Sequence, residues 1–427
     1  MIKLILVFGI TLFHVSVSSP IRFRYGIIID AGSSSSKLHL YRWIPKTDIK
    51  QVPKFEDVLY KKFRPGVAAF YPNLEEIEEY VMDMLRTLEN DVMPEEETSK
   101  TRISFLATAG LRFLPEEETL AVLNKVRSVL GNKTLNPFLY DDKDVTVLSG
   151  EEESVFSWMT VNYLKGTFYS SKDELESEGM IEIGGGSVQI AYATEVPVYD
   201  GKVSVRVGNQ LYDVYTHSFL SYGSGSIATR IQRHLLRENP HATGLINPCM
   251  LRDDKIPALM RNKLIKIYGE GNASECARIV KQYLKAVPEE QCSPKPCTIG
   301  GVYGPPIPSM NFVALGNIHA TTTELGVLNR TGELDLHTLE SRAAYFCGLN
   351  LTEARNEFNV TERWASSDCQ NGVYIPMLLR ALGFHDDVKI FAKKYINNVK
   401  VGWTLGAILH HVENSYMTRC IDDKDMC

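Results

Sequence analysis

Two stretches of sequence decide the fold: IIIDAGSSSSKLHLY at residues 27–41 and MIEIGGGSVQIAYA at residues 180–193. Each stretch places an apolar run, a carboxylate and a cluster of small residues in the same order. Asp30 aligns with Glu182 at an offset of 152 residues, 182 minus 30. The same offset aligns three further pairs, namely Gly32 with Gly184, Ser34 with Gly186 and Ser35 with Ser187. The sequence therefore predicts that the chain is internally duplicated.

Each stretch is typical of a strand, a tight turn and a second strand, because β-branched and aliphatic residues flank small residues that tolerate positive φ. Backbone N–H groups in such turns can approach an anion, so two turns placed face to face would hold a polyphosphate. A carboxylate beside a phosphate repels it unless a divalent cation lies between them. The pattern therefore predicts that the ligand is a metal-bound phosphate ester.

Other interpretations of the two turns are weaker. The first turn could be a polar hairpin, but four consecutive serines at 33–36 are a poor hairpin design, since Asn-Gly or Gly-Gly turns achieve this more simply. Three glycines at 184–186 weaken a strand unless a ligand or another backbone comes close. Neither turn matches G-x-G-x-x-G or G-x-x-x-x-G-K-S/T, which disfavours Rossmann and P-loop folds.

Length and charge limit the possible classes. With 427 residues, of which 44% are hydrophobic, the chain is long enough for two domains that each bury a sizeable core. The formal net charge is −6. Nucleic-acid-binding domains usually carry a basic patch, so this charge disfavours a nucleic acid as the partner.

The N-terminus has the layout of a secretory signal peptide. Lys3 precedes an apolar stretch at 4–17, and the small residues Ser18 and Ser19 follow, so we expect a signal peptide at 1–19 cleaved near these serines. An uncleaved anchor is the rival interpretation, but roughly 14 apolar residues fall short of the ~20 that span a bilayer. We therefore expect a protein that is secreted or lies in the lumen of the secretory pathway, without a stable membrane span.

The cysteines agree with that compartment. All eight lie in the second half of the chain, and an even number after a signal peptide favours disulfide bonds. Proximity in sequence suggests four pairs: Cys292 with Cys297, Cys347 with Cys369, Cys249 with Cys276, and Cys420 with Cys427. A zinc site is disfavoured, because no C-x-x-C or H-E-x-x-H occurs. Five N-x-S/T sequons are possible glycosylation points: Asn132, Asn272, Asn329, Asn350 and Asn359.

The rest of the chain alternates strand and helix patterns, which predicts an α/β fold with mixed sheets. In the first half we expect a helix over about 73–93, a strand over 102–107, a helix opened by Pro115 and a strand over 144–148. Ser149 with Glu152 is typical of the capping box that starts a helix. Downstream we expect strands near 192–207 and helices near 227–236 and 262–284.

Composition alone gives no reason to assign a function to three residues outside the turns. Glutamates at a helix start, such as Glu153, are usually solvated partners of the helix dipole. Thr108 could simply cap a turn after a strand. Trp403 is expected to be a buried helix residue, with Gly406 permitting close packing.

Five blocks, taken in order, resemble the five apyrase conserved regions of the ecto-apyrase, or nucleoside triphosphate diphosphohydrolase, family. They are DAGSSSSKLHLY, ATAGLRFLP, SGEEESVFSWMTVNYL, MIEIGGGSVQIAY and GWTLGAILH, and they span Asp30 to His410. HSFLSYG at 217 and CSPKPCTIGGVYGPP at 292 are also similar to the family. Five motifs in family order are far more specific than any one of them.

The resemblance implies an actin-like α/β architecture, in which two related ribonuclease-H-like lobes with mixed sheets bind nucleotide phosphates in the cleft between them. This agrees with the predicted duplication. The resemblance also implies that the C-terminal block returns to the first lobe. Lobe I would then comprise 20–147 plus 392–427, and lobe II would comprise 148–391.

The resemblance also implies roles for single residues. Asp30 and Glu182 would hold a Ca²⁺ or Mg²⁺ ion, largely through waters, as hard oxygen ligands should. The phosphates would be bound by Ser33, Ser34 and Ser35 of the first turn and by Gly184, Gly185 and Gly186 of the second. Glu153 would be the general base that deprotonates a water. Thr108, Ser187 and Gln189 would help to position that water and the metal's hydration shell. No covalent phosphoenzyme is needed.

Four departures from the family pattern stand out. Glu182 replaces a common aspartate, Ser154 replaces a frequent glycine, and Ser35 stands where many cell-surface members have histidine. The segment LGNIHA at 315–320 lacks the aromatic run that stacks on the base in those members. Tyr345 or Tyr374 are candidates for that role, and the base preference stays open.

Three classes of function remain. The first is a secreted, metal-dependent apyrase that hydrolyses nucleoside tri- and/or diphosphates. The second is an actin-like-fold kinase that transfers phosphate to an acceptor, which export disfavours because ATP is scarce outside cells. The third is a non-catalytic nucleotide-binding or structural protein of the actin type, in which Glu153 and Gln189 would have no function. The sequence leaves the choice of Ca²⁺ or Mg²⁺, the tri- or diphosphate preference and the oligomeric state open.

Overall fold

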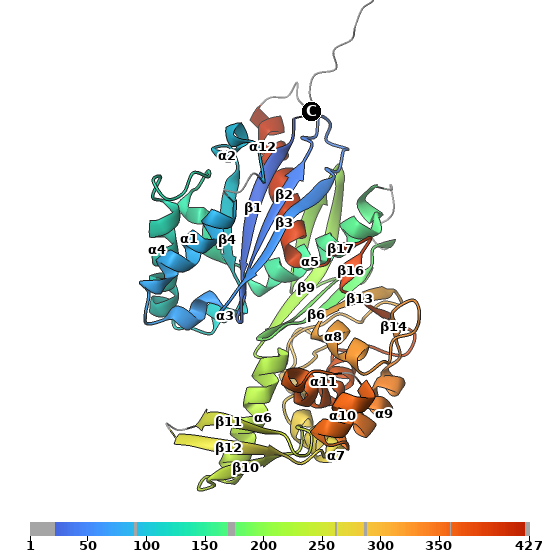
Figure 1. Cartoon of the computed structure of the whole chain (residues 1–427). Coiled ribbons are helices and arrows are strands. Elements are labelled where there is room, and N and C mark those ends of the chain that lie inside the picture. The colour runs from blue at the N-terminus through green and yellow to red at the C-terminus, as the bar shows by residue number, and fades with distance from the viewer. Residues whose placement is uncertain are drawn as a thin grey trace, which may run out of the picture.

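Two sheets with the same central strand order form the framework of the molecule (Figure 1). The computed structural model describes residues 22–88, 92–169, 176–260, 263–285, 288–358 and 360–422. The expected signal peptide at 1–19, the sequon at Asn359 and the expected pair of Cys420 with Cys427 fall outside what these ranges describe.

The first sheet has the strand order β3-β2-β1-β4-β5. Its strands are β1 (Arg24–Ala31), β2 (Ser36–Trp43), β3 (Phe55–Phe63), β4 (Arg102–Ala107) and β5 (Val145–Val147). β1 pairs antiparallel with β2, and β2 with β3, whereas β1 pairs parallel with β4, and β4 with β5. The strands expected over 102–107 and 144–148 are therefore confirmed as β4 and β5.

The second sheet repeats this arrangement, with the order β14-β15-β13-β6-β7-β9-β8. Its strands are β6 (Gly179–Ile183), β7 (Ser187–Ala193), β8 (Lys202–Val207), β9 (Gln210–Leu220), β13 (Asn311–Gly316), β14 (Glu333–Leu334) and β15 (Lys389–Ala392). The antiparallel series β6, β7, β9 corresponds to β1, β2, β3, and the parallel series β6, β13, β15 corresponds to β1, β4, β5. The predicted duplication is thus confirmed in the strand order, with β8 and β14 added at the edges.

Helices pack against both faces of the first sheet. α1 (Glu76–Leu88) and α4 (Glu116–Leu130) lie on one face, where Ile77 and Val126 join Ile27 and Ile29 in one core. The alternating residue Ile28 points to the opposite face, toward α12. The remaining short helices here are α2 (Glu95–Thr98), α3 (Ala109–Arg112) and the 3₁₀ helices η1 (Val67–Phe70), η2 (Asp142–Asp144) and η3 (Thr167–Tyr169). The expected helix over 73–93 thus begins at Glu76, and the helix opened by Pro115 begins at Glu116.

Two long helices, α5 (Gly150–Lys165) and α12 (Trp403–Asp422), lie between the sheets (Figure 1). The predicted capping box starts α5, because Ser149 Oγ accepts from the Glu152 N–H at 3.0 Å and Glu152 Oε2 accepts from the Ser149 N–H at 2.8 Å. The helices touch at backbone distance, since a Cβ on Gly406 would lie 1.9 Å from the carbonyl oxygen of Phe156. Trp403 is buried in α12, as expected.

A buried ion pair ties the junction of the two sheets. Lys46 Nζ lies 2.9 Å from Oε2 of Glu413 in α12, and the two side chains are only 2% and 1% exposed. The backbone N–H of Gly208, in the turn between β8 and β9, donates to the same oxygen at 3.0 Å. One carboxylate therefore holds together the loop after β2, the second sheet and the C-terminal helix.

The outer part of the second half is a small sheet with several helices (Figure 1). The sheet has the order β10-β12-β11, from β10 (Gly244–Asn247), β11 (Lys255–Met260) and β12 (Lys263–Gly269). The helices are α6 (Ser224–Glu238), α7 (Ala273–Lys281), α8 (Asn317–Glu324), α9 (Leu336–Cys347), α10 (Leu351–Phe358) and α11 (Glu362–Ala381), with the 3₁₀ helix η5 (Glu289–Gln291). None of the helices in the described ranges has the length and hydropathy of a membrane span.

The expectation of one helix over 262–284 is wrong in its first half. This part is β12, in which Ile265 and Ile267 are buried and Lys266 between them is not. That alternation has the period of a strand rather than of a helix. Asn272 then caps α7, its Oδ1 accepting from the Glu275 N–H at 3.0 Å.

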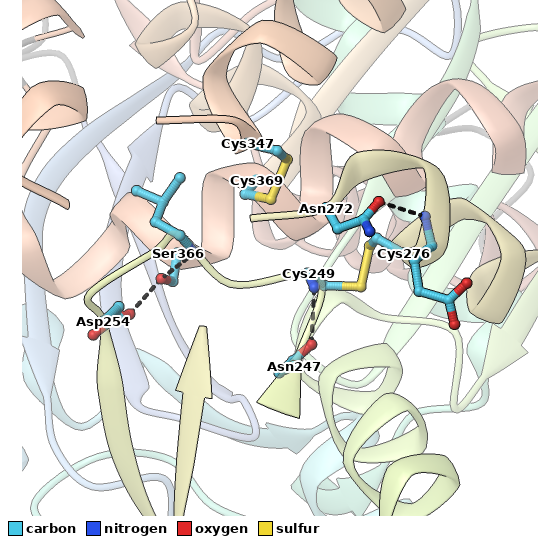
Figure 2. The surroundings of a disulfide bond; sticks show 10 residues. Asn247, Cys249, Asp254, Asn272, Cys276, Cys347, Ser366 and Cys369 are labelled. Atoms are coloured by element: carbon cyan, nitrogen blue, oxygen red, sulfur yellow. Dashed lines mark hydrogen bonds between the residues drawn. A yellow bond between two sulfur atoms is a disulfide. The ribbon is translucent and has the colours of Figure 1, made fainter. Parts of the chain in front are cut away.

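Three of the expected disulfide bonds are confirmed. Cys249–Cys276 and Cys347–Cys369 each span 4.9 Å between Cα atoms, and Cys292–Cys297 spans 5.8 Å. Figure 2 shows that the first two lie near each other, joining the segment after β10 to α7 and α9 to α11. These bonds close the outer part of the second half, away from the two turns.

Candidate active site

The two turns quoted at the start have the same internal hydrogen bond. The Gly32 N–H donates to the Ser35 carbonyl oxygen at 3.1 Å, and the Gly184 N–H donates to the Ser187 carbonyl oxygen at 3.0 Å. These are the pairs that the 152-residue offset aligned. The duplication therefore extends from strand order to the geometry of the turns.

The turns face each other across the gap between the sheets. A Cβ on Gly185 would lie only 3.1 Å from Ser33 Oγ, so the tips of the two turns are in contact range. The first turn is also packed from behind, because a Cβ on Gly110 of α3 would lie 2.8 Å from Ser33 Cα. A side chain at Gly110 would clash with the backbone of the first turn, and one at Gly185 would crowd the hydroxyl group of Ser33.

A cavity of about 580 Å³ opens beside the turns. Of the site residues expected from sequence, those that line it are Asp30, Ser33, Ser34, Ser35, Thr108, Glu153, Glu182, Gly184, Gly185, Gly186 and Ser187. Gln189 lies behind this surface, where its Nε2 donates to Ser187 Oγ at 2.6 Å and to Ser218 Oγ at 3.0 Å. The fold therefore gathers all the expected residues at one place.

Two carboxylates lie at the ends of corresponding strands, Asp30 in β1 and Glu182 in β6. Lys37 Nζ donates to Asp30 Oδ2 at 2.6 Å, and this negative charge raises the pKa of Lys37. Ser157 Oγ donates to Glu182 Oε2 at 3.4 Å. Burial raises the pKa of Glu182, Lys37 opposes the rise, and the charge of Asp30 adds to it. Lys37 therefore offsets part of the repulsion between the two acids, and a bound cation would offset more of it.

Glu153 is buried although it lies in the first turn of α5, with a side chain 11% exposed. It forms an ion pair with Arg112 of α3. Burial raises the pKa of Glu153 to about 7; Arg112 opposes this rise, and the negative charges of Glu182 and Asp30 add to it. A carboxyl group with this pKa can accept a proton near neutral pH.

Thr108 lies at the start of α3, where its backbone N–H donates to the Ala31 carbonyl oxygen at 3.2 Å. This bond ties the end of β4 to the first turn. The Thr108 side chain forms no capping hydrogen bond to the helix. Its hydroxyl group can therefore face the cavity that the residue lines.

The donor set fits a hard divalent cation held mainly by water and substrate. Carboxylate oxygens are the ligands that Ca²⁺ and Mg²⁺ prefer. Within the described ranges, no group of three or more His, Cys, Asp or Glu side chains is close enough to form an all-protein metal site. Asp30 and Glu182 would therefore provide two carboxylates, and phosphate oxygens and waters the remaining ligands.

Sequence reasoning missed several residues of the site. Arg112 lies inside the quoted block ATAGLRFLP, but nothing in the block indicates its partner. Asn317 of α8 donates from Nδ2 to the carbonyl oxygens of Ile183 and Gly184, both at 3.0 Å, and so fixes the second turn. Cavity-lining residues that were also not singled out are Lys37, His39, Lys62, His319, Glu324, Lys393, Lys394 and Lys400.

Neither tyrosine suggested for stacking on the base lines the cavity. Tyr345 is exposed and its hydroxyl group donates to Glu357 Oε2 at 2.7 Å. Tyr374 is buried, and its hydroxyl group donates to the Tyr222 carbonyl oxygen at 2.6 Å. The segment at 315–320 supplies Asn317 and His319 to the cavity instead of aromatic rings.

Solved structures of the same fold cover nearly the whole chain. The crystal structure of nucleoside triphosphate hydrolases from Neospora caninum is similar with a TM-score of 0.67 and 15% identity, over 92% of this chain and 93% of that one. A Ppx/GppA family member from Aquifex aeolicus is similar with a TM-score of 0.51 and 14% identity, over 92% of this chain and 99% of that one. At such identities the likeness shows the fold alone, and it confirms the actin-like prediction.

The GDA1/CD39 (nucleoside phosphatase) family matches residues 17–424. The chain belongs to this family. Ectonucleoside triphosphate diphosphohydrolase 1 of Bos taurus is 28% identical over 92% of this chain and 81% of its own length. A nucleoside-diphosphatase of Caenorhabditis elegans is 27% identical over 91% of this chain and 77% of its own length. A nucleoside-triphosphatase of Pisum sativum is 27% identical over 90% of this chain and 86% of its own length. The resemblance inferred from five motifs is therefore confirmed, and this GDA1/CD39 family member is a nucleotide phosphohydrolase.

Proposed function

We propose that this chain is a secreted, divalent-cation-dependent apyrase that removes the terminal phosphate from nucleoside tri- and/or diphosphates. The observation that carries the proposal is the convergence of two facing turns, two carboxylates and one buried glutamate on a cavity of about 580 Å³. Relatives named for triphosphates and for diphosphates support both substrate classes. Three disulfide bonds in the described ranges agree with an oxidising compartment.

In this proposal the two turns grip the terminal phosphate groups. The turn at Gly184, Gly185 and Gly186 contributes the backbone N–H groups of Gly185 and Gly186, and Ser33, Ser34 and Ser35 contribute hydroxyl groups, which donate to phosphate oxygens. Phosphoryl transfer needs positioning and charge neutralisation more than covalent chemistry, and preorganised donors supply both. Asp30 and Glu182 would hold Ca²⁺ or Mg²⁺, and the ion would supply positive charge that offsets the charges of the carboxylates and the phosphates.

Glu153 acts as the general base in this mechanism. It accepts the proton of a water whose oxygen attacks the terminal phosphorus, while the bridging oxygen leaves with its electron pair. Thr108, Ser187 and Gln189 orient the water, and the 2.6 Å hydrogen bond from Gln189 to Ser187 Oγ supports this arrangement. No phosphoenzyme forms, because water itself is the nucleophile.

We also propose the lobe boundaries expected above, with lobe I at 20–147 plus 392–427 and lobe II at 148–391. Contact of α12 with β1 supports assignment of the C-terminal segment to the first lobe, although α12 also packs against α5 and β8 of the proposed second lobe. Contacts of α5 with β6, β7 and β9 support assignment of that helix to the second. The substrate would then bridge the two lobes.

One assay tests the function. Purified protein is incubated with ATP, ADP, GDP, UDP or AMP, with Mg²⁺, Ca²⁺ or EDTA and without an acceptor, and phosphate release is measured. Release from di- or triphosphates that EDTA abolishes is the expected result. Phosphate transfer only after an acceptor is added would favour the kinase alternative, and binding without turnover would overturn the proposal.

A further inference from the structure

We propose that the cleft carries a second phosphate-binding surface beside the turns, and that through it the enzyme also shortens linear inorganic polyphosphate from its end. The terminal phosphate would occupy the turns, and the following phosphates would lie on a cluster of lysines. The inference rests on the proposed function, because it uses the same catalytic centre for a second class of substrate.

The lysine cluster consists of Lys62, Lys393, Lys394 and Lys400, and all four line the same cavity as the two turns. Lys62 lies in β3, Lys393 and Lys394 follow β15, and Lys400 ends β17. The small strands β16 (Tyr395–Ile396) and β17 (Val399–Lys400) form a hairpin that precedes α12. Segments more than 300 positions apart thus bring like charges to the lining of one cavity, in a protein whose net charge is −6.

The charges follow a fixed order across the first sheet. Asp30 of β1 is directly opposite Lys37 of β2, and Lys37 is directly opposite Lys62 of β3. Because neighbouring strands lie about 4.8 Å apart, Lys62 stands roughly 10 Å from Asp30 across the sheet. The wall therefore changes from negative at the catalytic centre to positive beside it.

Protein groups do not neutralise the lysine cluster. In the described part of the chain, no member pairs with a carboxylate. Lys400 Nζ donates to Tyr60 Oη at 2.6 Å, Lys393 to the Thr331 carbonyl oxygen, and Lys394 lies over the Tyr395 ring at 5.6 Å. Burial lowers the pKa of Lys62, and the positive charges of Arg64, Lys37 and Lys400 lower it further. Like charges placed together destabilise a sheet, and a bound anion would relieve this repulsion.

The acids in the cleft already have other partners. Glu153 pairs with Arg112, and Asp30 and Glu182 are assigned to the cation. Glu324, the fourth carboxylate on the cavity wall, hydrogen-bonds Asp368, and burial together with this contact raises the pKa of Asp368 to about 9. The positive charge of the lysine cluster is therefore available to a ligand.

The chemistry of this wall fits a chain of phosphates better than a nucleoside. Beyond its phosphates, a nucleotide presents a neutral ribose and base, whereas four lysines match a longer run of negative charges. Tyr60, the aromatic residue that contacts Lys400, is covered by Lys400 Nζ, which lies 4.0 Å from its ring centroid. A base therefore finds no open ring at Tyr60, while phosphate oxygens find ammonium donors.

The reaction balances as a hydrolysis. The oxygen of water forms a bond to the terminal phosphorus, and the bond from that phosphorus to the bridging oxygen breaks. The bridging oxygen keeps the electron pair, and Glu153 takes a proton from the water. The products are orthophosphate and a chain shorter by one phosphate.

Two variants and a matched control test the proposal. Phosphate release with Mg²⁺ is measured from tripolyphosphate, from longer linear polyphosphate and from the best nucleoside diphosphate, for wild type, Lys62→Gln, Lys400→Gln and Lys61→Gln. Lys61 is adjacent to Lys62 but points to the other face of β3, where its Nζ donates to Thr87 Oγ1 at 3.0 Å. It therefore controls for the loss of one charge.

We expect wild type to hydrolyse both polyphosphates. Lys62→Gln and Lys400→Gln should each lower kcat/KM for polyphosphate about tenfold, the size of one charge-assisted contact, and lower nucleotide hydrolysis by less than about threefold. Lys61→Gln should change neither activity. Wild-type polyphosphate hydrolysis should also fall more steeply with added salt than that of Lys62→Gln.

Several results would overturn the inference. If wild type hydrolyses nucleotides but releases no phosphate from polyphosphate, the inference fails and the proposed function stands. If Lys61→Gln and Lys62→Gln lowered polyphosphate hydrolysis equally, the lysine cluster would not be the polyphosphate-binding surface. The same conclusion would follow if the variants lost polyphosphate and nucleotide hydrolysis to the same extent. Polyphosphate hydrolysis that persists in Glu153→Gln would place that activity elsewhere. A wild type that hydrolyses neither substrate would defeat the proposed function itself.

Discussion

At the scale of single residues, two neighbouring glutamates of α5 have different surroundings: Glu152 caps the helix, and Glu153 is the proposed general base. Its neighbour Glu152 is exposed and closes the capping box with Ser149. Glu153, one position later, is turned into the cleft and paired with Arg112. A helix advances 100° per residue, so adjacent glutamates necessarily face different surroundings.

Replacing Glu153 by glutamine should lower kcat by about 10²- to 10⁴-fold, the usual contribution of a general base. The fold and the dependence on a divalent cation should remain, as circular dichroism and a cation titration would show. Glu152→Gln is the control, because glutamine also serves in a capping box. Near-normal turnover of Glu153→Gln would remove this residue from the proposed role.

The pH dependence should follow the pKa of Glu153, which burial raises to about 7. A general base acts when deprotonated, so kcat/KM should fall as the pH drops below this pKa and level off above it. Positive charge lowers a carboxyl pKa, so a bound cation should move the midpoint downward.

Arg112→Gln should move the same midpoint to higher pH, because Arg112 holds the pKa of Glu153 down. Profiles of wild type and variant are compared at one cation concentration, so that the effect of the metal cancels. A midpoint that does not move, or that moves to lower pH, would contradict the assignment of Glu153 as the titrating base.

The site residues that sequence could predict are those whose chemistry is local. Asp30 and Glu182, each with the small residues that follow it, indicate phosphate-binding turns, because each motif spans only a few positions. Arg112 is 41 positions from Glu153, and Lys400 is 340 positions from Tyr60. Such partners are brought together only by folding, so no local pattern indicates them.

At the scale of elements, the close crossing of α5 and α12 depends on Gly406, which has no side chain. Gly406→Ala would place a Cβ 1.9 Å from the Phe156 carbonyl oxygen and force the helices apart. Overpacking of this kind costs about 1–3 kcal/mol, and we expect a loss of that size in the free energy of unfolding measured with urea.

Gly402→Ala is the matched control for this crossing. Gly402 lies four positions earlier, and a Cβ there would meet nothing within 4 Å. We expect a change within about 0.5 kcal/mol, as for other uncrowded sites. Equal destabilisation by the two substitutions would show that the close crossing does not limit the packing of these helices.

Helices and strands could be predicted from sequence where the spacing of apolar residues follows a single period. The strand at 102–107 and the helix that follows Ser149 have clear patterns and clear boundaries. The stretch at 262–284 joins a strand and a helix within a few residues, and its lysines and apolar residues satisfy either period over a short window. Pairing of β12 with β10 and with its neighbour β11 decides between them, and both partners lie outside the stretch at 262–284.

At the scale of the whole molecule, the buried pair of Lys46 and Glu413 should be one of the strongest single ties at the junction of the two sheets. Removing one partner leaves the other charge buried, which typically costs about 3–5 kcal/mol. Glu413→Gln should therefore unfold at clearly lower urea concentration. Catalysis by the folded fraction should persist, since neither residue lines the active-site cavity.

A double substitution separates lost charge from lost packing. Lys46→Met with Glu413→Leu removes both charges together and should destabilise less than Glu413→Gln alone, because no unpaired ion remains. Should the double variant prove as unstable as the single, the hydrogen bond from Gly208 rather than the ion pair would hold the junction.

The repeated backbone has a consequence for the direction of the proposed chemistry. If the two halves were fully equivalent, water could approach the bound phosphate from either half, and neither direction would be preferred. Glu153 breaks that equivalence, because it stands on α5, which follows β5, whereas α12, the helix that follows β15 in the second half, brings Trp403 and Thr404 to the cavity and no carboxylate. In the proposed mechanism, the direction from which water approaches is therefore set by a residue that only one of the two repeats carries.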